Sequence, residues 1–254
     1  MTAPDRGWAL VAGAGARLGR AVALDLAAAG WSVAVHYNGS AEGAEDTAAA
    51  VRARRVDAVT IRADLSDVSH LEDLMRQAYA ASHGRLEGLV NCAAAFEHDV
   101  IDTLETARFE RQMRINALAP ALLARAFAAS LHEDAAGAIV NFLDFKLASP
   151  YPDHFSYTLS KYALAGATEL LARALAPRLR VNAVAPGYVL PAPGHAEARY
   201  RALHPDTPLK RGPTPEDVAG AVRFLLESPA ITGQTIYVDA GRRFRSHDRD
   251  MAFD

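Results

Sequence analysis

The sequence predicts an α/β fold in which about seven parallel strands form one doubly wound sheet with helices on both faces. Short apolar runs bounded by turn residues alternate with segments of 3.6-residue period along the 254 residues. The runs are apolar at successive positions, which indicates strands buried on both faces, as in a parallel sheet. No linker, composition break or internal repeat interrupts the alternation, so we expect a single domain over residues 1–254.

The first half of the chain is expected to supply four strands and three helices. The predicted strands are WALVA (8–12), WSVAVHY (31–37), AVTIRA (58–63) and LEGLVN (86–91). The helical periods between them cover 18–29, 42–54 and 69–82. The first helix is expected to end at Gly30, because glycine readily adopts the conformation that terminates a helix.

The second half continues the pattern. A long helical pattern at 105–131 precedes the strand GAIVNFL (137–143), the helix 156–176, the strand RVNAVA (180–185), a helix starting at Pro215 and the strand TIYVDAG (235–241). Residues 186–213 hold six of the 13 prolines and show no clear period. A connection of that length favours a substrate lid over a plain connector, with a partly disordered insertion as the alternative.

The composition excludes several classes of partner. A net charge of −3 offers no basic field for nucleic acid. No apolar run reaches the ~18 residues of a membrane span and MTAPDRG has no signal core, so we expect a cytoplasmic protein without a membrane partner. The single cysteine, Cys92, is expected to be a buried packing residue, and the nine histidines show no metal-ligand spacing, so no metal is expected.

A glycine-rich turn, AGAGARLG at 12–19, follows the first strand directly. Gly13, Gly15 and Gly19 let the backbone approach a pyrophosphate, whose charge the following helix N-terminus attracts. The place of the turn, between the first strand and the first helix, favours a dinucleotide site over a tight turn without a ligand.

Two features indicate which dinucleotide is bound. An NAD enzyme usually ends its second strand with an acid that binds the ribose 2′-hydroxyl. This strand ends in His36, Tyr37, Asn38, Gly39 and Ser40, with no acid among them. Arg17 lies within the glycine turn, where a planar cation suits a 2′-phosphate. We therefore expect NADPH. The alternatives are a solvated cation at Arg17 and a helix N-cap at Ser40.

Two further strand ends are expected to face the cofactor. Asp64 follows the third strand and either binds the adenine amino group or opens a turn. Asn91 ends the fourth strand, and the small residues 92–95 after it leave room for the cofactor backbone.

Together these segments resemble the short-chain dehydrogenase/reductase family over nearly the whole chain. The matching motifs are the glycine turn 13–19, Asp64, Asn91-Cys92-Ala93-Ala94, Asn116, Tyr157-x-x-x-Lys161 and Pro186-Gly187. The resemblance implies a catalytic set of Asn116, Tyr157, Lys161 and the residue at position 144, which is serine in most of the family. It also implies a tetramer paired through the helices at 105–131 and 156–176, and cofactor contacts from Leu18, Leu65, Ala93, Tyr157, Lys161, Pro186, Gly187 and Val189.

A closer resemblance is to the pteridine reductase branch and to bacterial dihydromonapterin reductases. In that branch, arginine replaces the middle glycine of the turn and aspartate replaces the serine. Arg17 and Asp144 occupy these two positions here. The remaining matches are His36-Tyr37 before Ser40-Ala41, Ala63-Asp64-Leu65-Ser66, Phe96 and Val238-Asp239-Ala240-Gly241-Arg242. The sequence departs from this branch at three places. Gly39 stands where the branch has a basic residue, Ala94 stands where it has a serine, and Val189-Leu190 stand where a threonine is usual.

Tyr157 and Lys161 lie one helical turn apart. A tyrosine has an ordinary pKa of ~10, and a cationic Lys161 nearby favours the phenolate and is expected to lower that pKa. Asn116 is expected to order water that links Lys161 to solvent, the alternative being a helix-interior residue that makes a backbone contact. The alternative to a catalytic role is that Tyr157 and Lys161 merely share an ordinary helix face.

Asp144 follows the strand at 137–143, where a ketone reductase places a hydroxyl group. An ionised carboxylate ~4 Å from a developing oxyanion would oppose it by about 4 kcal/mol at an effective dielectric constant of 20, roughly a thousandfold in rate. Reduction of a C=N bond instead needs a proton on nitrogen, which a carboxylic acid beside Tyr157 can supply. Two acids in contact raise each other's pKa values, which keeps at least one protonated. The alternative is a strand-end turn residue.

Aromatic residues are expected to complete the substrate pocket. Phe96, just past the fourth strand, can stack on a flat heterocycle, or it anchors its loop on the core. Tyr188, and with lower weight Tyr151 and Phe155, can also line the pocket. The arginines after the last strand, Arg242, Arg243 and Arg245, are expected to form a solvated tail, the alternative being that Arg242 closes a pocket.

The leading hypothesis is therefore an NADPH-dependent reductase of a pterin ring C=N bond in a dihydromonapterin, dihydrobiopterin or dihydrofolate. The second hypothesis is a short-chain reductase of another imine or a carbonyl, with Asp144 protonated. The third is a non-catalytic NADP(H)-binding regulatory protein. The set of Tyr157, Lys161 and Asn116 argues against the third, because a sensor does not need it.

Overall fold

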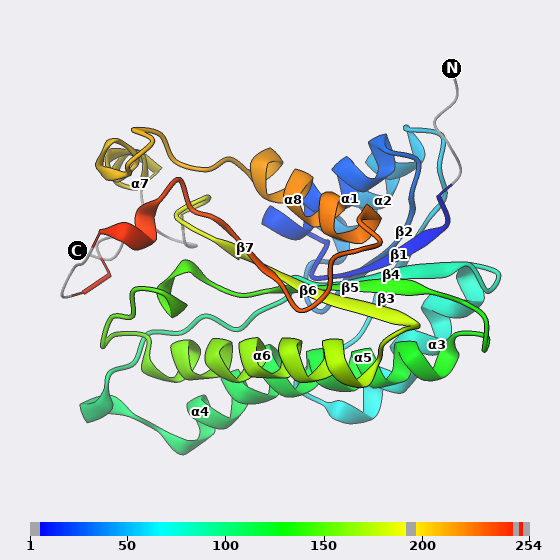
Figure 1. The fold of residues 1–254 in the computed structure, drawn as a ribbon, viewed down its shortest axis with the longest axis horizontal. Coiled ribbons are helices and arrows are strands. Elements are labelled where there is room, and N and C mark those ends of the chain that lie inside the picture. The colour runs from blue at the N-terminus through cyan, green and yellow to red at the C-terminus, as the bar shows by residue number, and fades with distance from the viewer. Residues whose placement is uncertain (1–5, 192–196, 246–248, 251–254) are drawn as a thin grey trace.

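Seven parallel strands form one sheet in the computed structural model, which describes residues 6–191, 197–245 and 249–250 (Figure 1). The spatial order is β3-β2-β1-β4-β5-β6-β7. The strands are β1 (Trp8–Ala12), β2 (Ser32–Tyr37), β3 (Ala58–Arg62), β4 (Leu86–Asn91), β5 (Gly137–Phe142), β6 (Leu179–Pro186) and β7 (Thr235–Val238). The predicted doubly wound α/β class is confirmed.

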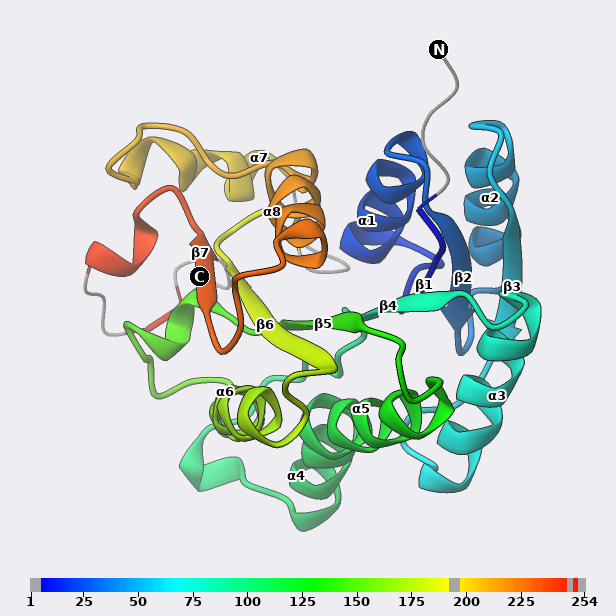
Figure 2. The ribbon, with the colours of Figure 1, turned by 45° about the vertical axis from the view of Figure 1, so that its right-hand side comes forward.

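Helices cover both faces of the sheet (Figures 1 and 2). One face carries α1 (Arg17–Ala28), α2 (Ala41–Arg52) and α8 (Pro215–Glu227). The other carries α3 (Leu71–Ala81), α4 (Thr106–Met113), α5 (Ala119–Ser130) and α6 (Phe155–Ala174). The short α7 (Glu197–Ala202) lies on the same side of the sheet as α8.

The core is split by the sheet into two layers, because successive strand residues point to opposite faces. Val11 of β1 and Val33 of β2 pack with α1, α2 and α8, whereas Leu10 of β1 packs with α3 and α5. All three valine and leucine side chains are fully buried. Burial on both faces explains why the strand segments are apolar at successive positions.

β1 and β4 are neighbours in the middle of the sheet. The strands run β1-β2-β3 to one side of this pair and β4-β5-β6-β7 to the other, so the strand order reverses between β1 and β4. At such a point the connections leave in opposite directions and open a crevice at the carboxyl ends of the strands, where ligands bind in this class of fold. The β1–α1 turn and the segments after β4, β5 and β6 all reach this edge.

The long helical pattern expected at 105–131 is confirmed: it consists of α4 and α5, which a π-helical turn, Arg114–Leu118, joins. The connection at 186–213 contains α7 and the 3-10 helix His204–Asp206, its residues 192–196 lie outside the described residues, and its role as a substrate lid stays a prediction. The solvated tail expected for Arg242 was wrong, because Arg242 is fully buried and pairs with Asp206 at 2.6 Å.

No helix within the described ranges is both long and apolar enough to cross a bilayer. Among the same residues, no group of three or more histidine, cysteine, aspartate or glutamate side chains is placed to hold a metal ion.

Candidate active site

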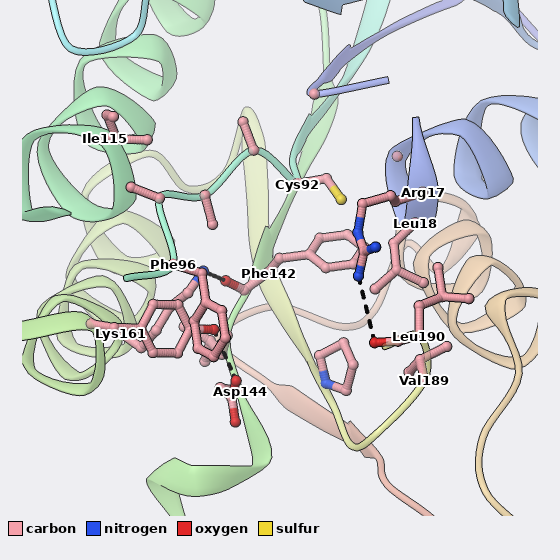
Figure 3. Close-up of a pocket in the computed structure, with 18 of the residues that line it drawn as sticks. Arg17, Leu18, Cys92, Phe96, Ile115, Phe142, Asp144, Lys161, Val189 and Leu190 are labelled. Atoms are coloured by element: carbon pink, nitrogen blue, oxygen red, sulfur yellow. Dashed lines mark hydrogen bonds between the residues drawn. The ribbon is translucent and has the colours of Figure 1, made fainter. Parts of the chain in front are cut away.

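A pocket of about 610 Å³ opens at the carboxyl ends of the central strands. Figure 3 shows Arg17 and Leu18 on one side of it and Phe96, Lys161 and Asp144 on the other. Most residues singled out in the sequence line this pocket: Gly13, Arg17, Leu18, Gly19, His36, Asn38, Asp64, Leu65, Ala93, Phe96, Asp144, Tyr157, Lys161, Pro186, Gly187, Tyr188 and Val189.

The glycine turn leaves no room for side chains at two of its positions. A Cβ atom on Gly19 would lie 2.2 Å from the Gly13 carbonyl oxygen, and one on Gly13, whose φ is 79°, would lie 2.9 Å from Ala93 Cα. The turn delivers the N-terminus of α1 to the pocket, and the N-cap residue Ala16 has no side-chain hydrogen bond to the first helical turn. This cradle of backbone N–H groups fits the pyrophosphate of a dinucleotide.

His36 holds the glycine turn from behind. Its Nδ1 accepts a hydrogen bond from the Gly13 N–H at 3.0 Å, so its Nε2 carries the proton and donates to the Ala63 carbonyl at 3.1 Å. Burial lowers the pKa of His36 to about 4, which keeps the ring neutral and able to accept from Gly13. The side chain is 2% exposed, so it shapes the cofactor end of the pocket mainly by positioning the turn.

Arg17 occupies a backbone conformation that ordinarily favours glycine, with φ 53°. A non-glycine residue there costs about 1 kcal/mol or more. The guanidinium donates to the Pro191 carbonyl at 2.7 Å and, more weakly, to the Leu190 carbonyl at 3.5 Å. Figure 3 shows it reaching toward Leu190 across the pocket. The structure therefore places an exposed cation in the lining of the pocket that Asn38 also lines, and its binding to a 2′-phosphate stays a prediction.

Asp64 lies on the pocket wall and also closes a turn. Its Oδ1 accepts from the Ser66 N–H at 2.9 Å and from the Ser66 hydroxyl at 2.7 Å, and these hydrogen bonds hold the pKa of Asp64 below its usual value. The turn considered from the sequence is therefore present at Asp64, and binding of the adenine amino group by this lining residue stays a prediction.

Five of the predicted residues lie behind the pocket wall. Gly15 packs against α2, since a Cβ there would lie 3.2 Å from the Ser40 carbonyl oxygen, and Ser40 takes the N-cap position of α2 without a side-chain bond. Tyr37 packs on the core beside α1 and α2. Asn91 is buried and donates to Asn141 Oδ1 at 2.8 Å, which ties β4 to β5. The fifth is Asn116.

Asn116 lies in the π-helical turn between α4 and α5 and is 1% exposed. Its side chain accepts from the Ala95 N–H and donates to the Ala95 carbonyl, both at 2.8 Å, and also donates to the Ser160 hydroxyl at 2.9 Å. The amide therefore ties the segment after β4 to α6, which carries Tyr157 and Lys161. The backbone contact considered from the sequence is present, and a link to Lys161 through water stays a prediction.

Asp144, Tyr157 and Lys161 meet in the centre of the pocket. The Tyr157 hydroxyl donates to Asp144 Oδ2 at 2.8 Å, and the Lys161 ammonium donates to the Phe142 carbonyl at 2.7 Å (Figure 3). The Lys161 nitrogen lies 5.5 Å from the Tyr157 ring centroid. Asp144 also accepts from the Lys146 N–H at 2.9 Å, which fixes the carboxyl group at the end of β5.

Burial decides the protonation of this group. It raises the pKa of Asp144 above its usual value and, together with the Asp144 carboxyl, raises the pKa of Tyr157 well above its usual value. It lowers the pKa of Lys161 to about 8. The expectation that Lys161 lowers the pKa of Tyr157 differs from this result, because the carboxyl group in direct contact with the phenol and the loss of water outweigh an ammonium farther away.

Phe96 covers the Asp144–Tyr157 pair from the segment after β4. Its ring stacks on His154 with centroids 4.4 Å apart and meets the Tyr157 ring edge-on at 4.6 Å. The side chain is 39% exposed and lines the pocket, so one part of the ring anchors the loop while another part is open to a ligand.

Several lining residues were not singled out from the sequence. Lys146 and Asp250 lie in the wall beside Asp144, and Tyr200 of the 186–213 connection packs on Tyr188 with ring centroids 5.6 Å apart. The others not singled out for the site are Ala16, Ala95, Arg111, Ile115, Phe142, Leu143 and Phe145. Only Lys146 had a usable signal, because a lysine two residues after a strand-end aspartate shares its turn.

Comparisons with known proteins agree with this geometry. The family described as enoyl-(acyl carrier protein) reductase matches residues 13–243. A 3-oxoacyl-[acyl-carrier-protein] reductase, FabG of Staphylococcus aureus, is 32% identical and covers 92% of this chain and 96% of its own. An uncharacterised oxidoreductase of Methylorubrum extorquens is 34% identical over 92% of this chain and 97% of its own. The structure of FolM, alternative dihydrofolate reductase 1 from Brucella canis complexed with NADP, superposes with a TM-score of 0.90 at 35% identity and covers 96% of each chain.

Proposed function

Because the chain belongs to the short-chain dehydrogenase/reductase family, we propose that it reduces a pterin ring C=N bond, converting a dihydropterin to the tetrahydro form with NADPH. The observation that carries the proposal is the hydrogen bond of 2.8 Å between the Tyr157 hydroxyl and the Asp144 carboxyl group. Both groups are buried and have raised pKa values, so the pair holds its protons where a reduced nitrogen needs one.

The cofactor end of the pocket fits NADPH. The backbone cradle of Gly13 and Gly19 suits the pyrophosphate, Arg17 suits the 2′-phosphate, and no acid follows β2 to prefer a free 2′-hydroxyl. The FolM structures from two Brucella species contain NADP. NADPH supplies a hydride when bound.

Three further residues of this chain have roles in the proposed reaction. Lys161 donates to the Phe142 carbonyl beside the expected nicotinamide ribose and places a cation below the Tyr157 ring. Asp144 lies in direct contact with the phenol and can pass a proton to the ring nitrogen of the substrate directly or through Tyr157. Phe96 lines the pocket and is 39% exposed, so its ring can contact a flat heterocycle.

The second candidate is a carbonyl reductase, which the similarity to FabG favours. A panel assay that follows NADPH absorbance decides between the two. We expect turnover of 7,8-dihydrobiopterin, dihydromonapterin or dihydrofolate, and slower turnover of simple ketones, quinones and acetoacetyl thioesters. Faster turnover of an acetoacetyl thioester than of every dihydropterin would contradict the proposal, and no turnover of either class would support a binding protein.

Replacing Arg17 with alanine should weaken NADPH binding about tenfold or more and leave NADH binding nearly unchanged, because only NADPH carries the phosphate that the guanidinium can bind. The measurement is the dissociation constant of each cofactor. Arg54→Ala, which removes an exposed arginine after α2, is the matched control. Equal losses for both cofactors would show that Arg17 does not recognise the 2′-phosphate.

Replacing Phe96 with alanine should lower kcat/KM for a dihydropterin by about tenfold, since a stacking ring contributes ~1 kcal/mol beyond its buried area. The dissociation constant of NADPH should not change. An unchanged kcat/KM with a lowered melting temperature would show that Phe96 serves only to anchor its loop on His154.

The protein is proposed to assemble as a homotetramer in the cytoplasm. Apolar side chains stay exposed along α6, at Leu159, Tyr162 and Leu170, and a Cβ atom on Gly166 of the same helix would meet no atom within 4 Å. Light scattering should give a mass near four chains, and Leu170→Glu should lower that mass, because it places a charge on the apolar stripe. A monomeric wild-type protein would contradict the assembly.

A further inference from the structure

His154 lies three residues before Tyr157, at the N-cap position of α6, and holds an unusual backbone conformation. Its φ is 50°, a left-handed value that glycine adopts freely and other residues adopt rarely. The residue is also buried, at 1% exposure. A strained backbone of this kind persists only where its surroundings hold it in place.

The His154 side chain contacts three successive residues of the segment after β4. Its ring stacks on the Phe96 ring, with centroids 4.4 Å apart and 7° between the ring planes. Its Nδ1 donates to the Glu97 carbonyl at 3.2 Å, since a carbonyl can only accept. The His98 ring makes a T-shaped contact with it at 5.0 Å. One side chain of α6 therefore holds residues 96–98.

Asp99 continues the same contact along α6. Its carboxyl group accepts from the Ser156 N–H at 3.1 Å and from the Ser156 hydroxyl, and its backbone carbonyl accepts from the Phe155 N–H at 3.2 Å. Asp99 and Ser156 are both fully buried. The segment 96–99 is thus fastened to residues 154–156, directly before Tyr157.

The His154 ring can influence a bound substrate only through its neighbours. Burial lowers the pKa of His154 to about 4, so the ring is neutral near pH 7. Among the described residues, the pocket lining includes Phe96 and Tyr157 but not His154. The Phe96 ring lies between these roles, because it stacks on His154 and makes a T-shaped contact with the Tyr157 ring at 4.6 Å.

We propose that His154 is a positioning residue, which sets the orientation of the Phe96 ring beside Tyr157 and thereby the place of the substrate ring in the pocket. The inference rests on the proposed function, in which a flat heterocycle contacts Phe96. The stack fixes the plane of the Phe96 ring, and the hydrogen bond to Glu97 fixes the backbone beside it. A contact residue that is already in place costs less to order when the substrate binds.

The first test compares two variants of His154. His154→Asn tolerates the left-handed backbone and keeps an N–H near the position of Nδ1, but it removes the stacked ring. His154→Phe keeps a ring and removes that N–H. We expect kcat/KM for a dihydropterin to fall about fivefold to tenfold in His154→Asn and to recover to within about twofold of wild type in His154→Phe. The dissociation constant of NADPH should not change in either variant.

Three results of this comparison would overturn the inference. They are an unchanged kcat/KM in His154→Asn, an equal loss in both variants, and a loss of NADPH affinity that parallels the loss of kcat/KM. The matched control is His83→Asn. His83 has a φ of 51°, is exposed and precedes β4, at the edge of the sheet opposite the pocket, so this change should not alter kcat/KM.

A double variant separates positioning from a general loss of structure. If His154 acts through Phe96, then Phe96→Ala with His154→Asn should be no slower than Phe96→Ala alone, because no ring is left to orient. Losses that multiply would show that His154 acts independently of Phe96, and they would overturn the inference.

The inference can fail separately from the proposed function. If wild type reduces no dihydropterin, the reaction assignment is wrong, but the orientation of Phe96 can still be compared in crystal structures of the wild type and of both His154 variants. We expect the Phe96 ring to leave its wild-type position in His154→Asn and to keep it in His154→Phe. A Phe96 ring that stays in place in His154→Asn would overturn the inference, whatever the substrate.

Discussion

Replacing Asp144 with serine should lower turnover of a dihydropterin by about 100-fold or more, the usual scale for losing a general acid. Serine restores the hydroxyl group that most of the family has at this position, but it cannot supply a proton as a carboxylic acid does. Asp144→Asn should be at least as slow, since it keeps the shape of the side chain and loses the proton.

The same serine variant should gain activity toward activated ketones or quinones. Where Asp144 is ionised, above the apparent pKa of the pair, it opposes the oxyanion of ketone reduction by about 4 kcal/mol at ~4 Å, and that repulsion disappears with serine. Steady-state kcat/KM values for dihydropterins and for ketones or quinones measure the loss of the first activity and the gain of the second. Dihydropterin turnover equal to that of wild type in both variants would show that Asp144 is only a strand-end turn residue.

The pH dependence of kcat gives an independent measurement of Asp144. Burial raises the pKa of Asp144, and burial together with Asp144 raises that of Tyr157, so the active pair is the protonated one. Activity should therefore be present at low pH and decline as pH rises through the apparent pKa of the pair. Asp144→Asn should shift or abolish this decline, because one of the two coupled acids is gone.

Replacing Tyr157 with phenylalanine should lower dihydropterin turnover by about 100-fold to 10,000-fold, because it removes the hydroxyl group that donates to Asp144 at 2.8 Å. The ring remains, so the edge-on contact with Phe96 and the Lys161 packing should persist. An unchanged dissociation constant for NADPH is the control for a folded cofactor site.

A double variant shows whether Asp144 and Tyr157 act as one proton-donating unit. Residues in one hydrogen-bonded pair are strongly non-additive, so Asp144→Asn with Tyr157→Phe should be little slower than the slower single variant. Losses that multiply would show two independent roles. In that case the proton would reach the substrate from one residue, and the other would act on substrate binding.

The order of the elements could be predicted from the sequence because it depends on local pattern. Seven apolar runs in alternation with helical periods leave one common arrangement, a doubly wound parallel sheet. The glycine turn at 13–19 follows from the same local logic, since a close backbone approach excludes a Cβ atom at Gly19. Tyr157 and Lys161 were placed on one helix face by a spacing of four residues.

The position of Asp144 was predictable in part. Its place directly after β5 assigns it to the carboxyl edge of the sheet, where the site lies in such folds. The contact with Tyr157 and the direction of both pKa shifts depend on burial, which sequence spacing does not measure. The predicted lowering of the Tyr157 pKa by Lys161 failed for that reason.

Only the tertiary structure brought together the charges beside Asp144. Lys146 and Asp250 are separated by more than 100 residues, and Arg242 pairs with Asp206 across 36 residues. By itself the sequence determined the fold, the glycine turn and the shared helix face of Tyr157 and Lys161, because each is encoded within a strand, a turn or one helical turn. Folding decided which of the distant charged residues are buried together, since that depends on how the chain end and the 186–213 connection pack over the sheet edge.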